Sequence, residues 1–94
     1  MTFRIHFNEE KNQLLKVTRG VCFDDAIKAL ENDKVLADII HPSKKYKHQR
    51  IYILNINNYA YAVPYVINTR KKEIFLKTMF ASRVFTSRYL KRRK

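Results

Sequence analysis

The stretch RIYILNINNYAYAVPYVI, residues 50–67, decides the fold of this chain of 94 residues. Apolar and aromatic side chains alternate on both sides of Asn57-Asn58, a pair that tolerates the positive φ angles of a two-residue turn. Two such runs separated by such a pair are typical of a β-hairpin. The sequence therefore predicts two paired strands here, with Pro64 marking a bulge or a sheet edge.

The segments on the N-terminal side of this hairpin predict two helices between two strands. Asn8 is a suitable helix N-cap, and Gly20 is the only glycine and can end the same helix in a left-handed conformation. Phe23, Ile27 and Leu30 share one face of a second helix. The predicted elements are strands at 2–7 and 35–41 and helices at 11–19 and 24–32.

The segments around and after the hairpin complete the predicted fold. Residues 44–50 form a basic loop, residues 73–80 a further strand, and residues 81–90 either a short helix or an irregular segment. We therefore expect a single α+β domain, residues 1–94, in which two N-terminal helices pack on an antiparallel sheet and a short helix ends the chain.

Charge divides the chain into two unlike parts. The whole chain carries 20 Lys and Arg against 8 Asp and Glu, a net charge of +12. Acidic and basic residues are balanced in residues 1–40, whereas residues 41–94 contain one acidic residue, Glu73. Solvated faces usually mix both signs, so this imbalance predicts an anionic partner. The absence of a long apolar run predicts a cytoplasmic protein without a membrane partner.

The cationic part favours chemistry that needs neither metal nor cofactor. A metal-dependent nuclease requires several carboxylates, and the three histidines and the single cysteine lack zinc-ligand spacing. RNA can be cut without a metal when a base activates its 2′-hydroxyl and fixed cations stabilise the charged phosphate. His41, His48, Tyr89 and several Lys and Arg residues offer these groups, although composition alone does not separate a catalyst from a binder.

Several short motifs together resemble the BrnT toxins, a family within the RelE/ParE fold group. The spacing is kept by Phe7-Asn8, Lys11, the segment Gly20–Phe23 and Ala26. Further along, Arg50 opens a strand and Ala81-Ser82-Arg83 follows one, as in the family. Asn8 stands where the family has Asp, and His48 stands where it has an acidic residue before Arg50.

The resemblance implies the toxin of a type II toxin–antitoxin system, a metal-independent endoribonuclease that cleaves mRNA, free or on the ribosome, and inhibits translation. It also implies a cognate antitoxin, a ribbon-helix-helix DNA-binding protein. The toxin would bind operator DNA only through this antitoxin. We expect Arg50, which opens a strand, and Arg83, which follows one, to stabilise the phosphate, because these two strands are predicted to be neighbours. The acid and base then come from His48, Lys77 and Tyr89, whose position is similar to that of the Tyr of RelE-like nucleases. The residues expected to bind RNA are Lys44, Lys45, Lys47, Arg70, Lys71 and Arg88.

Two other functions fit the same sequence. A toxin of the ParE branch would inhibit DNA gyrase by binding, and its toxicity would survive the loss of His48 and Tyr89. A noncatalytic RNA- or ribosome-binding module would be harmless on expression, and its affinity would fall steeply with salt.

Overall fold

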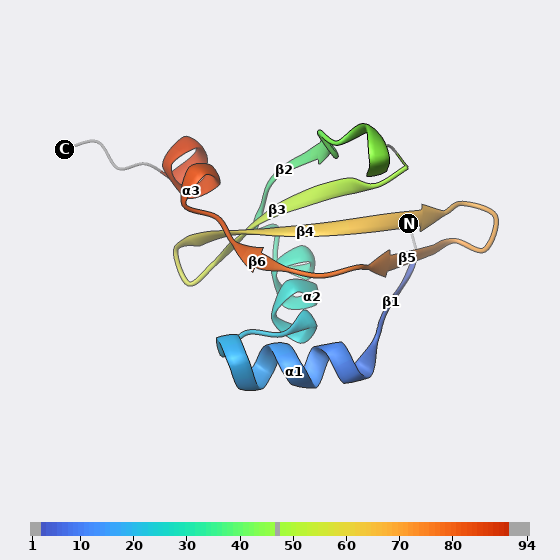
Figure 1. Cartoon of the computed structure of the whole chain (residues 1–94), viewed down its shortest axis with the longest axis horizontal. Helices are drawn as coiled ribbons and strands as arrows, with labels where there is room; N and C mark the ends of the chain where they lie inside the picture. Colours follow the sequence, from blue (N-terminus) through green and yellow to red (C-terminus); the bar gives the residue numbers. More distant parts are fainter. Residues whose placement is uncertain (1–2, 47, 91–94) are drawn as a thin grey trace.

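The molecule is built around one mixed β-sheet (Figure 1). The computed structural model describes residues 3–46 and 48–90 of the chain. The strands of that part are β1 (Arg4–Phe7), β2 (Val35–Ile40), β3 (Arg50–Ile56), β4 (Tyr59–Asn68), β5 (Glu73–Leu76) and β6 (Phe80–Ala81). Its helices are α1 (Glu9–Arg19), α2 (Phe23–Glu31) and α3 (Arg83–Leu90), with a 3₁₀ turn at Lys44–Tyr46. The predicted α+β class is confirmed.

The strands follow one another in the order β1-β5-β4-β3-β2, and β6 also pairs with β4. All these pairs are antiparallel except that of β1 with β5, which is parallel. The prediction of a purely antiparallel sheet is therefore wrong at this edge. Residue alternation indicates a strand but not its direction, and no tight hairpin joins β1 to β5.

The central hairpin has the predicted turn. Ile56 and Tyr59 form the last pair between β3 and β4, so Asn57-Asn58 alone makes the connection. The φ angles of these two asparagines are 55° and 64°. Positive values at both positions are those of a type I′ turn, whose twist matches that of the two strands.

Both predicted caps of α1 are confirmed. The side-chain oxygen of Asn8 accepts a hydrogen bond from the backbone N–H of Lys11 at 2.9 Å. Gly20 has a φ of 74°, and its N–H donates to the carbonyl of Lys16 at 3.2 Å. The helix nevertheless begins at Glu9, two residues before the predicted start, because the capped first turn belongs to the helix.

A buried asparagine joins α1 to α2. The side chain of Asn12 is only 1% exposed, and its oxygen accepts a hydrogen bond from the backbone N–H of Phe23 at 2.7 Å. This N–H belongs to the first residue of α2 and would otherwise lack an intrahelical partner. The contact fixes where the second helix starts, one residue earlier than the sequence pattern predicts.

The sheet is covered on both faces. In Figure 1, α1 and α2 lie below the sheet and α3 lies above it. The larger core joins Phe23 and Ala26 of α2 to Leu54 and Val63 of the central hairpin. A smaller cluster on the other face includes Ile53 and is covered by side chains of α3. In the described part of the chain, no helix is long and apolar enough to cross a membrane.

The predicted strand at 73–80 is interrupted by a bulge. Leu76 pairs with Tyr65, and Phe80 pairs with Ala62. The chain therefore advances four residues on this segment while β4 advances three. One extra residue reverses the alternation beyond it. Met79 therefore enters the larger core, fully buried, whereas Phe80 pairs with Ala62 of the other face and is 40% exposed.

Pro64 lies opposite this bulge, in agreement with the prediction that it marks one. The carbonyl of Pro64 accepts a hydrogen bond from the backbone N–H of Lys77 at 2.8 Å. In an antiparallel pair, the backbone carbonyl and nitrogen of one residue point to the same neighbouring strand. The nitrogen of Pro64, which carries no hydrogen, therefore also faces the segment 77–80. The central strand thus lacks a ladder donor where its neighbour departs from regular pairing.

Candidate nucleic-acid interface

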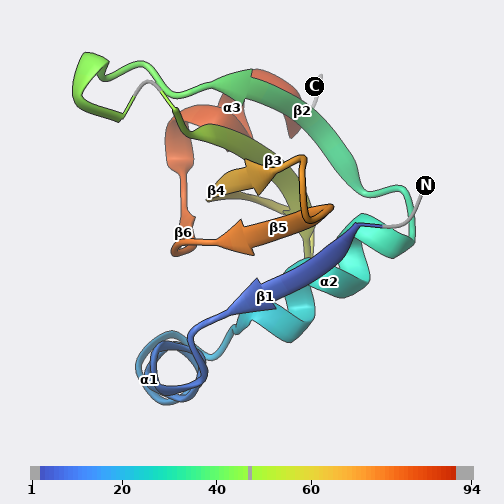
Figure 2. The same cartoon turned by 90° about the vertical axis from the view of Figure 1, so that its right-hand side faces the viewer.

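A groove with a volume of about 300 Å³ lies between α1, the 3₁₀ turn and the bulged segment 77–80. Figure 2 shows the 3₁₀ turn (green) and α1 (blue) projecting on the same side of the sheet. The bulge contributes to this surface because it places Lys77 and Phe80 on one face. We call this surface the Lys11–Lys77 groove. Its lining includes Lys11, His41, Tyr46, Gln49, Lys77 and Phe80.

A second hollow, of about 640 Å³, adjoins the groove. Asn8, Leu14 and Phe75 help to line it, and it shares Lys11 and Lys77 with the groove. Two lysines from distant parts of the chain therefore lie where the two hollows meet. Both lysines are exposed.

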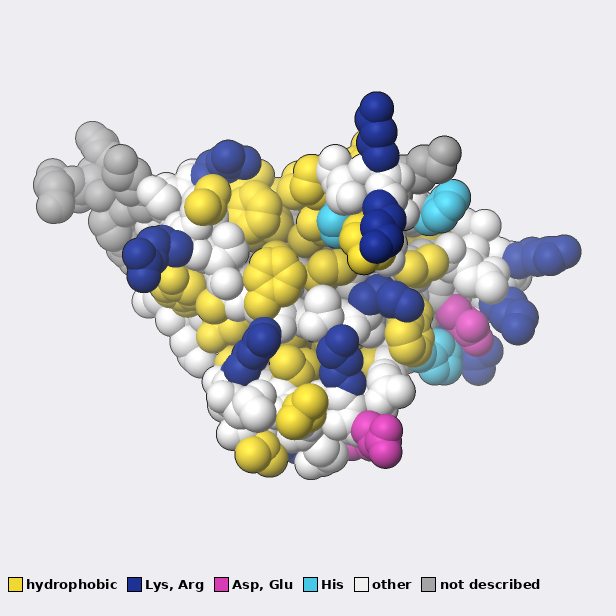
Figure 3. All heavy atoms as spheres, viewed as in Figure 1, with side chains coloured by type: hydrophobic (Ala, Val, Ile, Leu, Met, Phe, Trp, Pro, Cys, Tyr) yellow, Lys and Arg dark blue, Asp and Glu magenta, His cyan; other side chains and the backbone are white. Residues whose placement is uncertain are grey.

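Two lysines on or near this surface lie over aromatic rings. Lys77 Nζ lies 5.2 Å from the ring centroid of Phe75, and Lys45 Nζ lies 5.5 Å from that of Tyr46. Figure 3 shows Lys and Arg side chains around exposed apolar side chains, with Asp and Glu only toward the lower and right-hand margins of this face. Such a surface suits nucleic acid, because cations bind phosphates and exposed rings stack on bases.

His41 lies on the groove in a defined orientation. Its Nδ1 accepts a hydrogen bond from the backbone N–H of Ser43 at 3.2 Å, and its ring centroid is 5.0 Å from that of Tyr46. With Nδ1 as acceptor, the neutral ring carries its proton on Nε2. The sequence offers this histidine as one of several possible acids or bases, and the structure adds that it lines a groove.

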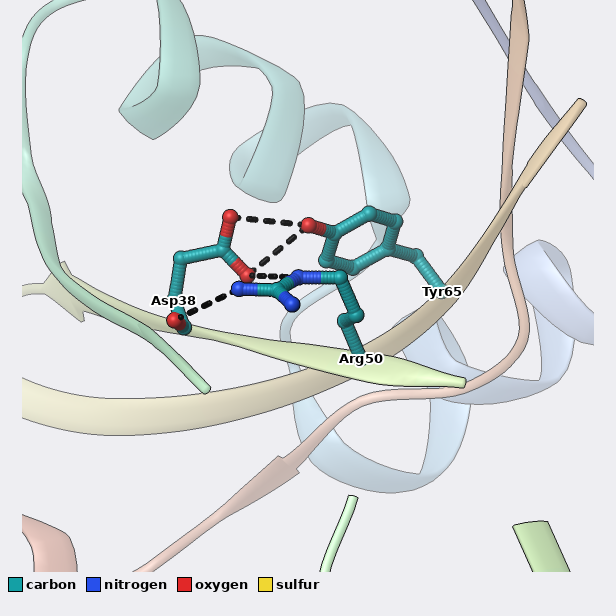
Figure 4. Close-up of polar contacts among 3 residues, drawn as sticks. All are labelled: Asp38, Arg50 and Tyr65. Atoms are coloured by element: carbon teal, nitrogen blue, oxygen red, sulfur yellow. Dashed lines mark hydrogen bonds and ion pairs between the residues drawn. The ribbon is translucent and has the colours of Figure 1, made fainter. Parts of the chain in front are cut away.

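Arg50 belongs to a different cluster, formed with Asp38 of β2 and Tyr65 of β4 (Figure 4). The Nε of Arg50 donates to a carboxylate oxygen of Asp38 at 3.2 Å, and one terminal nitrogen donates to the Asp38 carbonyl at 3.1 Å. The hydroxyl of Tyr65 lies 2.8 Å from both carboxylate oxygens. The ring of Tyr65 also stacks on Tyr52, with centroids 4.0 Å apart.

The two stacked tyrosines are held in their protonated form. Burial, together with the hydrogen bond to Asp38, raises the pKa of Tyr65 well above its ordinary value. Burial also raises the pKa of Tyr52. Hydrogen bonding to Tyr65 and Asp38 raises the pKa of Arg50, whose side chain remains 42% exposed. The cluster is therefore a fixed arrangement of a neutral phenol, a carboxylate and a guanidinium, not a group poised to exchange a proton near neutral pH.

Arg83 and Tyr89 lie on α3 and not beside Arg50. Strand β3 pairs with one side of β4, and β5 and β6 pair with the other side. The prediction that the strand opened by Arg50 and the strand before Arg83 are neighbours is therefore wrong. Alternation does not show which strands adjoin. Arg83 is exposed at the start of α3, whereas Tyr89 is half-buried and packs on the cluster that includes Ile53. Of the five predicted catalytic residues, only Lys77 lines the groove.

The other predicted residues are distributed over the surface. His48 is exposed just before β3, and Lys44 and Lys45 are exposed on the 3₁₀ turn. Lys47 lies outside the described residues. Arg70 and Lys71 are exposed at the turn between β4 and β5, and Arg88 is exposed on α3 with its guanidinium 5.7 Å from the Phe85 ring centroid.

The acidic residue of the cationic part is paired with β1, whereas Glu10 of α1 lines the adjoining hollow together with Lys77. Glu73, the only acidic residue of the cationic part, lies 3.5 Å from both Arg4 and His6 of β1. Among the residues that the structure describes, no group of three or more His, Cys, Asp or Glu side chains is placed to hold a metal ion.

The chain matches no protein-family model, no curated protein and no solved structure. The resemblance to BrnT toxins therefore stays a prediction from short motifs. The sequence reasoning missed two features that the structure shows: the contribution of Lys11, Gln49 and Phe80 to a groove, and the ion pair of Asp38 with Arg50. A single acid within the apolar segment VLADII, residues 35–40, was the one signal for the ion pair.

Proposed function

We propose that this chain binds RNA in the Lys11–Lys77 groove and cleaves it without a metal ion. The observation that carries the proposal is that Lys11 of α1 and Lys77 of the bulged segment line one groove. The same groove exposes Tyr46 and Phe80, each 40% exposed. Cations and aromatic rings in one hollow fit a backbone phosphate with an unpaired base beside it.

The groove also offers groups for the chemistry. Cleavage by the 2′-hydroxyl builds negative charge on the phosphate, which the ammonium groups of Lys11 and Lys77 would stabilise. His41 is the imidazole of the groove, and imidazole is the side chain that most readily exchanges protons near neutral pH. We assign phosphate stabilisation to Lys77 and proton transfer to His41, with exposed His48 as the other histidine available.

Within this proposal the protein is the cytoplasmic toxin of a type II toxin–antitoxin pair. That part rests on the motifs shared with BrnT toxins, which imply mRNA as substrate and a ribbon-helix-helix antitoxin as partner. The charge distribution is compatible with it, since an acidic segment of a partner would complement the cationic groove.

A noncatalytic RNA-binding module is the second candidate. Arg50 is held by Asp38, and Arg83 and Tyr89 lie on α3, away from Lys77. Catalytic groups must converge on one phosphate, whereas binding cations need only follow the backbone. The separation of these residues therefore favours binding without cleavage.

A cleavage assay with matched variants tests the proposal. Labelled mRNA would be incubated with purified protein, both naked and in a translating extract, and naked RNA would also be tested with EDTA. The variants are Lys77→Ala and His41→Gln, with Lys28→Ala on α2 as the control for loss of one exposed charge.

We expect cleavage by wild type and by Lys28→Ala that survives EDTA, and a loss of about a hundredfold or more in His41→Gln. Binding without cleavage in either format would move the assignment to the noncatalytic module. Growth arrest on expression without RNA binding or cleavage would refute both and leave the gyrase inhibitor.

A further inference from the structure

We propose that the Lys11–Lys77 groove is a pocket for one unpaired nucleobase, with Gln49 as the residue that selects the base. This inference rests on the proposed RNA binding and goes beyond it, because it names the substrate class and the source of sequence preference. Three properties of the groove carry it: its walls, its polar groups and the cations beside it.

The walls of the groove suit a flat aromatic ligand. Its volume of about 300 Å³ is small, and its lining includes the exposed rings of Tyr46 and Phe80 together with the buried Pro64. Tyr46 comes from the turn between β2 and β3, whereas Phe80 follows the bulge. A base that leaves its own stack recovers stacking energy on such rings, and this favours single-stranded RNA over a duplex.

The backbone of Gln49 is held by hydrogen bonds on both sides. Its N–H donates to the carbonyl of Tyr46 at 2.8 Å, and its carbonyl accepts from the N–H of His41 at 3.1 Å. Within residues 3–46 and 48–90, no side-chain hydrogen bond engages the amide of Gln49 or the hydroxyl of Thr78, and both residues belong to the lining of the groove.

These polar groups can distinguish one base from another. The amide of Gln49 offers a donor and an acceptor side by side, the pattern that side-chain amides use to bind a base edge. Thr78 adds a hydroxyl. A base whose edge matches these groups gains hydrogen bonds that the other bases lack.

The two lysines fit the phosphates beside such a base. Lys11 and Lys77 line both the groove and the adjoining hollow, so a strand whose base enters the groove places its backbone against them. Contacts to phosphate position the strand but carry no sequence information. Affinity and selectivity should therefore depend on different residues, which gives the test its internal control.

The test measures binding of short oligonucleotides that differ only in one central base. Ribose 2′-hydroxyls are methylated so that no cleavage occurs, and affinity is read by fluorescence anisotropy at constant salt. The proteins are wild type, Gln49→Leu, Thr78→Val and Lys77→Ala, each checked for folding by circular dichroism. Thr78→Val, of nearly identical shape, covers the case in which Gln49→Leu does not fold.

We expect wild type to prefer one base by about tenfold or more, and the preference to fall below about twofold in Gln49→Leu and to weaken in Thr78→Val. Lys77→Ala should lower the affinity for all oligonucleotides alike. Equal binding of all bases by wild type, or a preference retained in both pocket variants, overturns the inference while RNA binding stands. If wild type binds none of the oligonucleotides, the proposed function fails as well.

Discussion

Replacing Tyr65 by Phe removes one hydroxyl and leaves the rest of the Asp38–Arg50–Tyr65 cluster in place. The ring stays stacked on Tyr52 at 4.0 Å, so packing is kept. A hydrogen bond to a charged group contributes about 1.5–3 kcal/mol net. Because the Asp38 side chain is 37% exposed, water can replace the hydroxyl, and we expect Tyr65→Phe to lower the free energy of unfolding by about 1–2 kcal/mol.

The same hydroxyl makes this difference depend on pH. The pKa of Tyr65 is raised in the folded state, so above about pH 10 the unfolded chain loses this proton while the folded chain keeps it. The contribution of Tyr65 is therefore complete below about pH 10 and is lost as the pH rises toward the folded pKa. One pH unit above the unfolded pKa the loss is about 1.4 kcal/mol, so wild type and variant should be equally stable near about pH 11.

Urea unfolding followed by circular dichroism, between neutral pH and about pH 11, measures both effects. Tyr59→Phe is the control, since no hydrogen bond of its hydroxyl is seen in the described structure, and it should cost less than about 0.5 kcal/mol at neutral pH. The reasoning is refuted if Tyr65→Phe matches wild type at neutral pH. It is also refuted if the difference between them stays constant up to the alkaline end of the range.

Three further perturbations test other parts of the structure. Gly20→Ala should lower the free energy of unfolding by about 1 kcal/mol. The φ angle is 74° and the new methyl group meets no atom within 4 Å, so backbone strain is the only cost. An unchanged free energy of unfolding in urea would contradict this prediction. Thr86→Val removes the oxygen that accepts from the buried N–H of Ala60 at 2.8 Å and should cost about 1–3 kcal/mol, whereas Thr86→Ser should retain most of the stability. Lys77→Ala should reduce the slope of log affinity for single-stranded RNA against log salt by about 0.7, and an unchanged slope would remove Lys77 from the phosphate contacts.

The sequence predicts best those features that neighbouring residues determine. Asn57-Asn58 and Gly20 have the positive φ angles expected of them, and Asn8 caps the helix that it precedes. In each case the residue's own conformational preference or a side-chain contact three residues away is sufficient. These local signals also placed the elements in the right order along the chain.

Features that depend on contacts between distant segments were missed. Asp38 and Arg50 meet because β2 and β3 are neighbours in a particular register, in which Asp38 lies opposite Tyr52. Lys11 and Lys77 line one groove although they come from distant segments, and Phe80 joins them because the bulge turns it out of regular alternation. Charge and periodicity contain neither the register nor the extra residue, so the sequence predicted the cationic part of the chain but not the groove within it.

Pro64 gives the groove an origin that does not depend on any ligand. A regular strand would pair along β4 from Leu76 onward and flatten this side of the sheet, but the next ladder bond requires a hydrogen that the proline nitrogen does not carry. The missing hydrogen of the Pro64 nitrogen thus disfavours regular pairing of the segment after Leu76 with β4, and this effect requires no side chain to move. A molecule entering the hollow breaks no backbone pairing, so its binding energy is not diminished by the work of opening the sheet.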